Sequence, residues 1–100
     1  MADAAAVDIG RFIESKPEIR SGRPCLAGTG VTVHRVVQWY KLGHSPEEIA
    51  DRIGHLSLAQ VHAALSYYHA NQRQIEAEIA QEQAEADALE SQHTSTHAPR

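Results

Sequence analysis

The sequence is poor in the residues that cross-link small secreted proteins or hold metals. It has one cysteine, Cys25, among 100 residues, which excludes an intramolecular disulfide and a cysteine-rich zinc site. No apolar run reaches the roughly 18 residues that a membrane span requires, and the first eight residues lack the features of a signal peptide. These absences predict a cytoplasmic protein with no membrane contact.

Large apolar side chains are also few. The hydrophobic fraction is 42%, but sixteen of these residues are alanine. The remainder suffices for one small helical core, not for a doubly wound sheet or a sandwich. Seven histidines are present, but His55, His62 and His69 lie about 10 Å apart along a helix, too far for one tetrahedral ion. We therefore expect no enzymatic activity, no catalytic residues, no metal site, no cofactor and no small-molecule substrate.

Glycine and proline are almost absent from the second half of the chain. All six glycines and three of the four prolines precede His55, which predicts turns and short strands first and helices afterwards. A short strand is expected at residues 11–14. A small hairpin is expected with its turn at residues 27–30, because Gly28 and Gly30 tolerate positive φ. Whether this hairpin pairs within one chain or between two remains open.

Three helices are predicted after the hairpin, with boundaries set by capping signals. The first covers about residues 34–42 and ends before Gly43. The second begins with Ser45 as N-cap, Pro46 in the first turn and Glu48 completing a capping box, and it ends at Gly54. The third begins with another capping box at residues 57–60. Because no glycine or proline occurs from residue 55 to 98, this helix is predicted to continue to about residue 90.

The third helix is predicted to be too long for its own domain. It would span roughly 50 Å, whereas a domain of this size is only about 30 Å across. Its apolar residues recur at steps of three and four, so the distal part is expected outside the monomer's core, either in a homodimeric coiled coil or on a different protein. The predicted partner-binding residues are Tyr68, Gln72, Ile75, Ile79 and Leu89.

Charge is distributed unevenly between the two halves. Residues 10–45 contain six basic and two acidic side chains, whereas residues 74–92 contain six acids and no lysine or arginine. Both stretches can be ordinary solvated faces, but an acidic helix also favours a basic partner, such as a protein that handles nucleic acid.

A short second helix and a four-residue link to the third predict a helix-turn-helix arrangement. In such an arrangement Gln60 and His62 would face base edges, and Arg20, Arg23 and Arg35 could hold phosphates. DNA binding is therefore the second interpretation, although the first basic residue of the third helix is Arg73, too far along to reach the same site.

Several motifs together are similar to one known family. The segments SGRPCLAGT (21–29), VTV (31–33), GHSPEEI (43–49), LS (56–57) and AALSYY (63–68) resemble the bacterial domain-of-unknown-function family 433, from about Ile13 to Tyr68. The motif residues are Gly22, Pro24, Gly28, Thr29, Ser45 and Ser57. The resemblance implies a mainly α fold, in which a short N-terminal β-hairpin precedes a homeodomain-like three-helix unit. The family usually has arginine where this sequence has Gly30.

The resemblance also implies a function. Members of the family look like antitoxins of type II toxin–antitoxin pairs, which dimerise, cover a PIN-like ribonuclease toxin and often repress their own operon. The expected partners are a second copy, the cognate toxin and operator DNA, with transcriptional autoregulation as the alternative function. The expected organisation is a disordered N-terminus (1–10), a hairpin and three-helix domain (11–73), an acidic helical extension (74–90) and a disordered tail (91–100).

Overall fold

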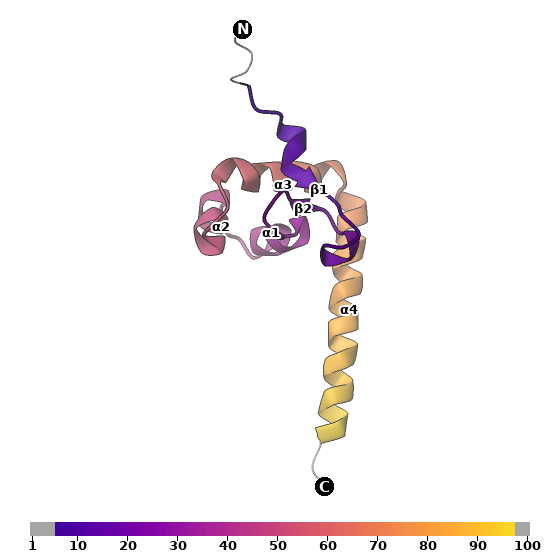
Figure 1. Cartoon of the computed structure of the whole chain (residues 1–100). Helices are drawn as coiled ribbons and strands as arrows, with labels where there is room; N and C mark the ends of the chain where they lie inside the picture. Colours follow the sequence, from indigo (N-terminus) through magenta and orange to yellow (C-terminus); the bar gives the residue numbers. More distant parts are fainter. Residues whose placement is uncertain (1–5, 98–100) are drawn as a thin grey trace. The chain divides into compact units, whose positions relative to one another are not determined.

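The computed structural model describes the backbone of residues 6–97 and the side chains of residues 6–91. The chain divides into two compact units, Met1–Ala70 and Asn71–Arg100. The first is mainly helical and has a two-stranded antiparallel sheet near its N-terminus (Figure 1). The second contains one helix, α4 (Gln72–His97), in its described part. None of the helices within the described range is both long and apolar enough to cross a membrane.

The N-terminal segment contains two short 3₁₀ turns and two short strands. Along the chain they are η2 (Ile9–Phe12), β1 (Ile13–Glu14), η3 (Arg20–Gly22) and β2 (Cys25–Leu26). In the sheet, Ile13 pairs with Leu26 and Glu14 with Cys25. The strand expected at residues 11–14 is thus confirmed over its second half, and η2 begins within the segment expected to be disordered.

The predicted hairpin pairing is present but short: Cys25 bridges Thr32, the Leu26 N–H donates to the Val31 carbonyl oxygen at 2.8 Å, and the Val33 N–H donates to the Pro24 carbonyl oxygen at 2.9 Å. β2 pairs mainly with β1, and no regular strand follows the turn in the described part of the chain. The reason is that Thr32 already caps the next helix: its Oγ1 accepts from the Arg35 N–H at 3.1 Å. A residue that caps a helix leaves no extended segment after it to pair as a strand.

The turn between β2 and this cap has the predicted conformation. Gly28 and Gly30 adopt φ values of 77° and 74°. The Thr29 hydroxyl donates to the Leu26 carbonyl oxygen at 2.7 Å and accepts from the Val31 N–H at 3.0 Å. Both motif residues, Gly28 and Thr29, therefore hold the loop in shape.

Replacing Gly30 with arginine, the residue that the resemblance led us to expect there, is expected to destabilise this chain. A Cβ at Gly30 meets nothing within 4 Å, so space is not the obstacle. The positive φ is strained for any L side chain, and we expect a loss of about 1 kcal/mol in the free energy of unfolding. Chemical denaturation measures it, with Gly10→Ala as the control at a position without positive φ; equal stabilities of wild type and Gly30→Arg would contradict the expectation.

The three helices of the first unit are α1 (Val33–Lys41), α2 (Pro46–Ile53) and α3 (Leu58–Ala70). Both ends of α1 and α2 and the start of α3 lie within a residue or two of those predicted. The capping box of α2 is present, with Ser45 and Glu48 bonding reciprocally at 3.1 and 2.8 Å. Ser57 and Gln60 form the same reciprocal pair before α3, at 3.1 and 2.7 Å. Gly54 ends α2 with φ 85°, as expected.

The α2 capping box also lowers the pKa of the Glu48 carboxyl, chiefly through the backbone hydrogen bond from Ser45, with smaller contributions from His44 and Arg52. Because the folded pKa lies below the unfolded one, the stabilisation is present above the unfolded pKa. It is lost as the pH falls through the folded pKa.

Removing the cap of α2 is expected to cost stability. Ser45→Ala deletes the acceptor of the Glu48 N–H and should reduce the free energy of unfolding by about 1 kcal/mol. Urea denaturation measures this loss. Ser15→Ala, at an exposed serine outside the helices, serves as the control and should change stability by less than about 0.5 kcal/mol. A Ser45 variant as stable as the control would contradict the assigned role.

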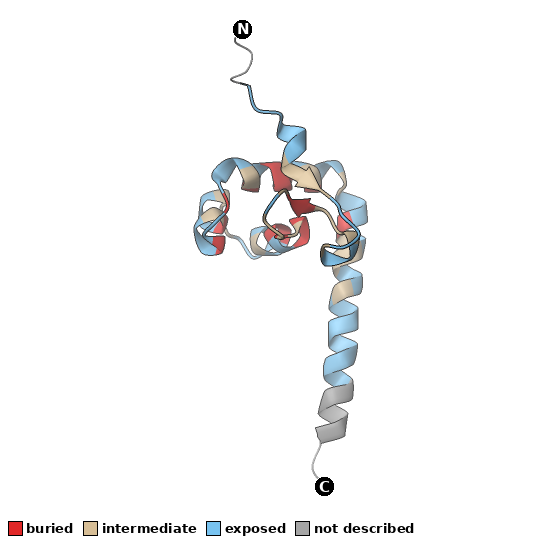
Figure 2. Ribbon diagram, viewed as in Figure 1, coloured by how far each residue is buried: buried red, intermediate tan, exposed pale blue. Residues whose placement is uncertain are grey.

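The core of the first unit forms where α3 packs against α1, α2, β1 and η2. Figure 2 shows buried residues on α1, α2, α3 and β2, whereas β1 is intermediate in burial. The largest fully buried side chains of the unit are Leu26, Val33, Val36, Val37, Ile49 and Val61. Isoleucine, leucine and valine from β2 and all three helices thus form one core.

The predicted single long helix is interrupted, so this expectation was wrong. α3 ends at Ala70, Asn71 lies in a turn, and α4 begins at Gln72. The Asn71 carbonyl oxygen accepts the Ile75 N–H at 3.0 Å, the first bond of the new helix. Asparagine is a favoured N-cap residue, which explains why a break occurs without glycine or proline. α4 continues to His97, past the predicted limit at residue 90 and into the segment expected to be disordered.

Candidate functional site

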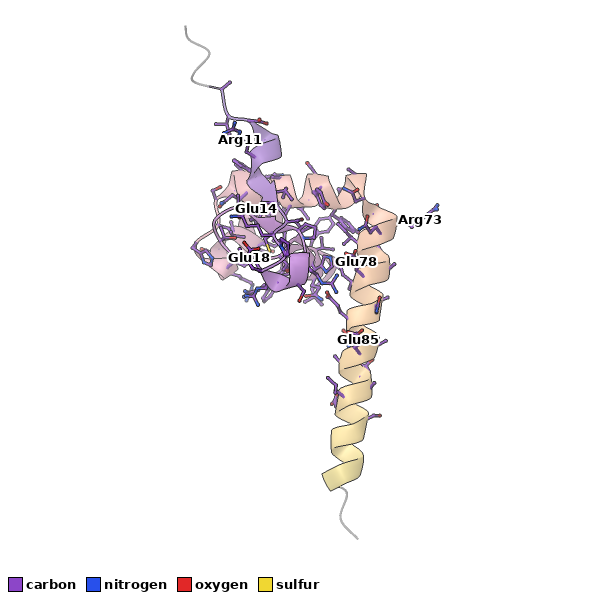
Figure 3. The ribbon with its side chains drawn as sticks, turned by 45° about the vertical axis from the view of Figure 1, so that its right-hand side comes forward. Arg11, Glu14, Glu18, Arg73, Glu78 and Glu85 are labelled. Atoms are coloured by element: carbon purple, nitrogen blue, oxygen red, sulfur yellow. The ribbon has the colours of Figure 1, made fainter. Side chains whose placement is uncertain are left out.

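α4 is an acidic helix whose distal part is exposed. Its acids are Glu76, Glu78, Glu82, Glu85, Asp87 and Glu90, and no lysine or arginine occurs from residue 74 to 92. Three glutamines donate to carboxylates four residues later, in the pairs Gln74–Glu78, Gln81–Glu85 and Gln83–Asp87, at 3.1 to 3.3 Å. Such pairs stabilise a solvated helix without neighbours. Figure 3 labels Glu78 and Glu85 along it.

The five residues predicted to bind a partner differ in exposure. Gln72 is exposed, Ile79 is half-buried and Leu89 is 67% exposed. Tyr68 lies in α3 and is 4% exposed, and Ile75 is 1% exposed. The expectation that Ile75 lies outside the core was therefore wrong.

The exposed face of α3 carries little that could read DNA bases. His62 is exposed on this helix, whereas the Gln60 side-chain oxygen accepts the Ser57 N–H in the capping box. No lysine or arginine occurs between Leu58 and Ala70. Arginine, lysine, asparagine and glutamine make most specific base contacts. The exposed face of α3 therefore offers few side chains for base-specific contacts with DNA.

Two of the three arginines predicted to hold phosphates lie together. Arg20 and Arg35 line one cavity of about 150 Å³ at the start of α1, with Gly30, Val31 and Thr32. The Arg20 Nε donates to the Gly30 carbonyl oxygen at 3.1 Å. Arg23 is half-buried, follows η3 and does not line the cavity, and neither do Gln60 and His62.

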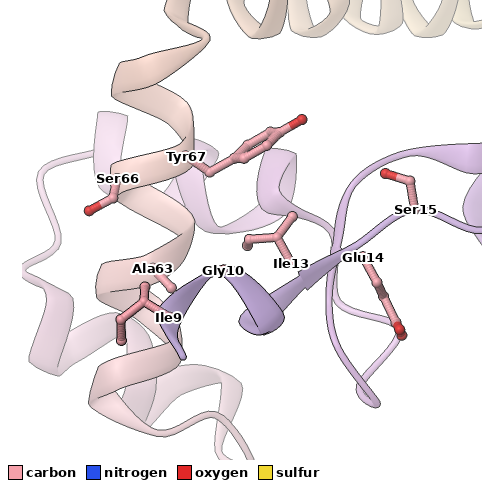
Figure 4. A pocket seen from close by; sticks show the side chains of 8 residues that line it. All are labelled: Ile9, Gly10, Ile13, Glu14, Ser15, Ala63, Ser66 and Tyr67. Carbon is pink, nitrogen blue, oxygen red and sulfur yellow. The ribbon is translucent and has the colours of Figure 1, made fainter. Parts of the chain in front are cut away.

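A larger groove of about 440 Å³ lies between the N-terminal segment and α3 (Figure 4). Its walls are mostly apolar, and Ile9 on its rim is 54% exposed. The lining residues are Ile9, Gly10, Ile13, Glu14, Ser15, Ala63, Ser66 and Tyr67. This groove was not predicted from the sequence, because it forms only when residues about 50 positions apart meet.

Cys25 and the histidines form no reactive centre in the described part of the chain. Cys25 is 3% exposed, and burial raises the pKa of its thiol; Glu14 adds to the rise, and Arg20 partly opposes it. A thiol with a raised pKa is a poor nucleophile. No cluster of three or more histidine, cysteine, aspartate or glutamate residues among those described is placed to hold a metal ion.

Comparisons with known proteins agree with this fold. The family model described as "Protein of unknown function (DUF433)" matches residues 13–68. The crystal structure of a DUF433 member protein from Anabaena variabilis ATCC 29413 is similar with a TM-score of 0.65 and 23% identity, covering 79% of this chain and 90% of that one. None of the curated proteins matches the sequence.

The first unit is thus a small, mainly helical domain with a short N-terminal two-stranded sheet. The chain belongs to the DUF433 family, and the resemblance seen in its motifs is confirmed.

Proposed function

We propose that this chain is a non-catalytic binding protein of the antitoxin type, which binds and neutralises a PIN-like ribonuclease toxin. The observation that carries the proposal is α4, a 26-residue helix with an acidic surface and a 67%-exposed leucine. A helix that presents acids around isolated apolar side chains suits docking into a groove of a basic partner. A ribonuclease, which must bind the RNA backbone, is such a partner.

We also propose that α1, α2 and α3 form a helix-turn-helix unit of the homeodomain type. The short α2 (Pro46–Ile53) and the four-residue link between α2 and α3 support this arrangement. The protein would act as a dimer, and the apolar groove beside β1 is a surface of the first unit suited to a second copy.

Co-expression with the product of the adjacent gene tests the proposal. The full chain should co-purify with that protein in a defined stoichiometry and suppress its ribonuclease activity and its toxicity to cells. The chain without its partner should be dimeric in light scattering over a concentration series. Absence of a complex together with unrelieved toxicity would sink the antitoxin proposal, and a monomer at all concentrations would remove the dimer.

A further inference from the structure

We propose that the cavity at the start of α1 is a binding site for a phosphate group. Among the described residues, its lining includes two arginines, Arg20 and Arg35, and no aspartate or glutamate. Its volume of about 150 Å³ exceeds the roughly 30 Å³ that a water molecule occupies in the liquid several times over. A tetrahedral oxyanion therefore fits. The site lies wholly in the first unit, so it does not depend on the proposed role of α4.

Arg35 places a positive charge at the N-terminal end of α1, where the helix dipole is already positive. Its backbone N–H donates to the Thr32 N-cap, so the side chain starts in the first turn of α1. The N-terminal end of a helix dipole favours anions and disfavours cations. Among the described residues, the Arg35 guanidinium forms no ion pair. Two arginines beside a helix N-terminus make the local potential positive, which favours the binding of an anion.

Arg20 is held in place by an unusual backbone. Arg20 and Ser21 adopt φ values of 50° and 57°, and Gly22 follows with 81°. Left-handed conformations are costly for residues with a Cβ, and such outliers gather at functional sites. This turn brings the Arg20 Nε to the Gly30 carbonyl oxygen at 3.1 Å. The bond fixes the guanidinium at the cavity and leaves its four other N–H donors for a ligand.

The nearby acid Glu14 does not neutralise this site. Its carboxylate accepts the Gly28 N–H at 3.1 Å and lies 3.7 Å from the Lys16 ammonium, and it does not line the cavity. Two planar guanidiniums with free donors match the oxygen pairs of a phosphate better than those of any neutral ligand. A free phosphate monoester and the phosphodiester of a nucleic-acid backbone share this chemistry.

Titration of the ¹⁵N-labelled full chain with inorganic phosphate at low, constant ionic strength tests the proposal. The backbone amides of residues 30–35 should shift and saturate in the wild type. Arg35→Gln, an exposed position where folding is not at risk, should weaken binding at least about tenfold through loss of a charge-assisted pair. Arg35→Lys, which keeps the charge but loses the planar fork, should lie in between.

Charge-matched controls distinguish phosphate binding at this cavity from non-specific electrostatic attraction to the protein. Arg11→Gln and Arg73→Gln remove the same charge at exposed positions outside the cavity and should leave phosphate binding within about twofold. Absence of saturable shifts, or equal weakening by the Arg35 and control variants, would overturn the site. Adenosine monophosphate and a short DNA strand identify the source. If the DNA strand binds more tightly than the other two ligands and Arg35→Gln abolishes this binding, the natural ligand is a nucleic-acid phosphate. If inorganic phosphate, adenosine monophosphate and the strand bind equally, the site recognises a free phosphate group.

Discussion

Replacing Leu26 with alanine is expected to reduce the free energy of unfolding by about 2–5 kcal/mol, a large fraction of the stability of so small a domain. Leu26 is 0% exposed and lies in β2, between β1 and the turn to α1. Its backbone bonds to Val31 and Thr29 remain in the variant, so the loss comes from the missing side chain and the cavity that it leaves. Urea unfolding followed by the fluorescence of Trp39 in α1 reports on this unit alone.

A second leucine provides the matched control for this substitution. Leu42 is 74% exposed at the C-cap of α1, and Leu42→Ala should change stability by less than about 0.5 kcal/mol. The two variants remove the same atoms, so their difference isolates burial. Equal urea midpoints would mean that β2 does not belong to the core described above.

If the chain binds a toxin as proposed, introducing a charge at Leu89 is expected to weaken that complex strongly. The leucine is 67% exposed in the free chain, so Leu89→Asp should leave the fold intact. If the side chain is buried at the contact, the carboxylate loses its water, and affinity should fall by about 2–4 kcal/mol, or roughly 30- to 1,000-fold in Kd. Calorimetry or biolayer interferometry with the purified toxin measures this change.

The opposite face of α4 supplies the control. Ala80 is exposed and lies nine residues before Leu89, which places it about 180° away around the helix. Ala80→Asp adds the same charge and should change affinity less than about threefold. Comparable losses for both variants would point to repulsion by net charge instead of burial of Leu89. Ile75 is unsuitable for this test because it is 1% exposed in the free chain.

Local sequence signals predicted the helices of the first unit well. Ser45 and Glu48 set the start of α2 through hydrogen bonds that span three residues, and Gly54 ends it. Such signals need no knowledge of the rest of the fold, so they can be recognised in the sequence. The break at Asn71 carries no comparably strong signal, because asparagine also occurs within helices, and the prediction therefore continued one helix through it.

For the candidate sites too, features set by neighbouring residues were predicted, whereas contacts between residues far apart in the sequence were not. Arg20 and Arg35 were both predicted to hold phosphates, but their meeting in one cavity depends on the left-handed turn at Arg20 and Ser21. Neither arginine nor serine favours that conformation, so the sequence gives no signal for the turn. Likewise, the pairing after the turn at residues 27–30 is limited to the Cys25–Thr32 bridge, because Thr32 also caps α1 by accepting the Arg35 N–H.

The burial of Cys25 has a consequence for how copies of this chain associate. A thiol that is 3% exposed and has a raised pKa offers no thiolate for exchange while β2 is in place. Cys25 is also the single cysteine of the sequence, so a disulfide between folded copies would need this buried thiol. We therefore expect the proposed dimer to be held by non-covalent contacts, so that its population rises and falls with protein concentration. The amount of protein in the cell would then itself set how much of it is assembled.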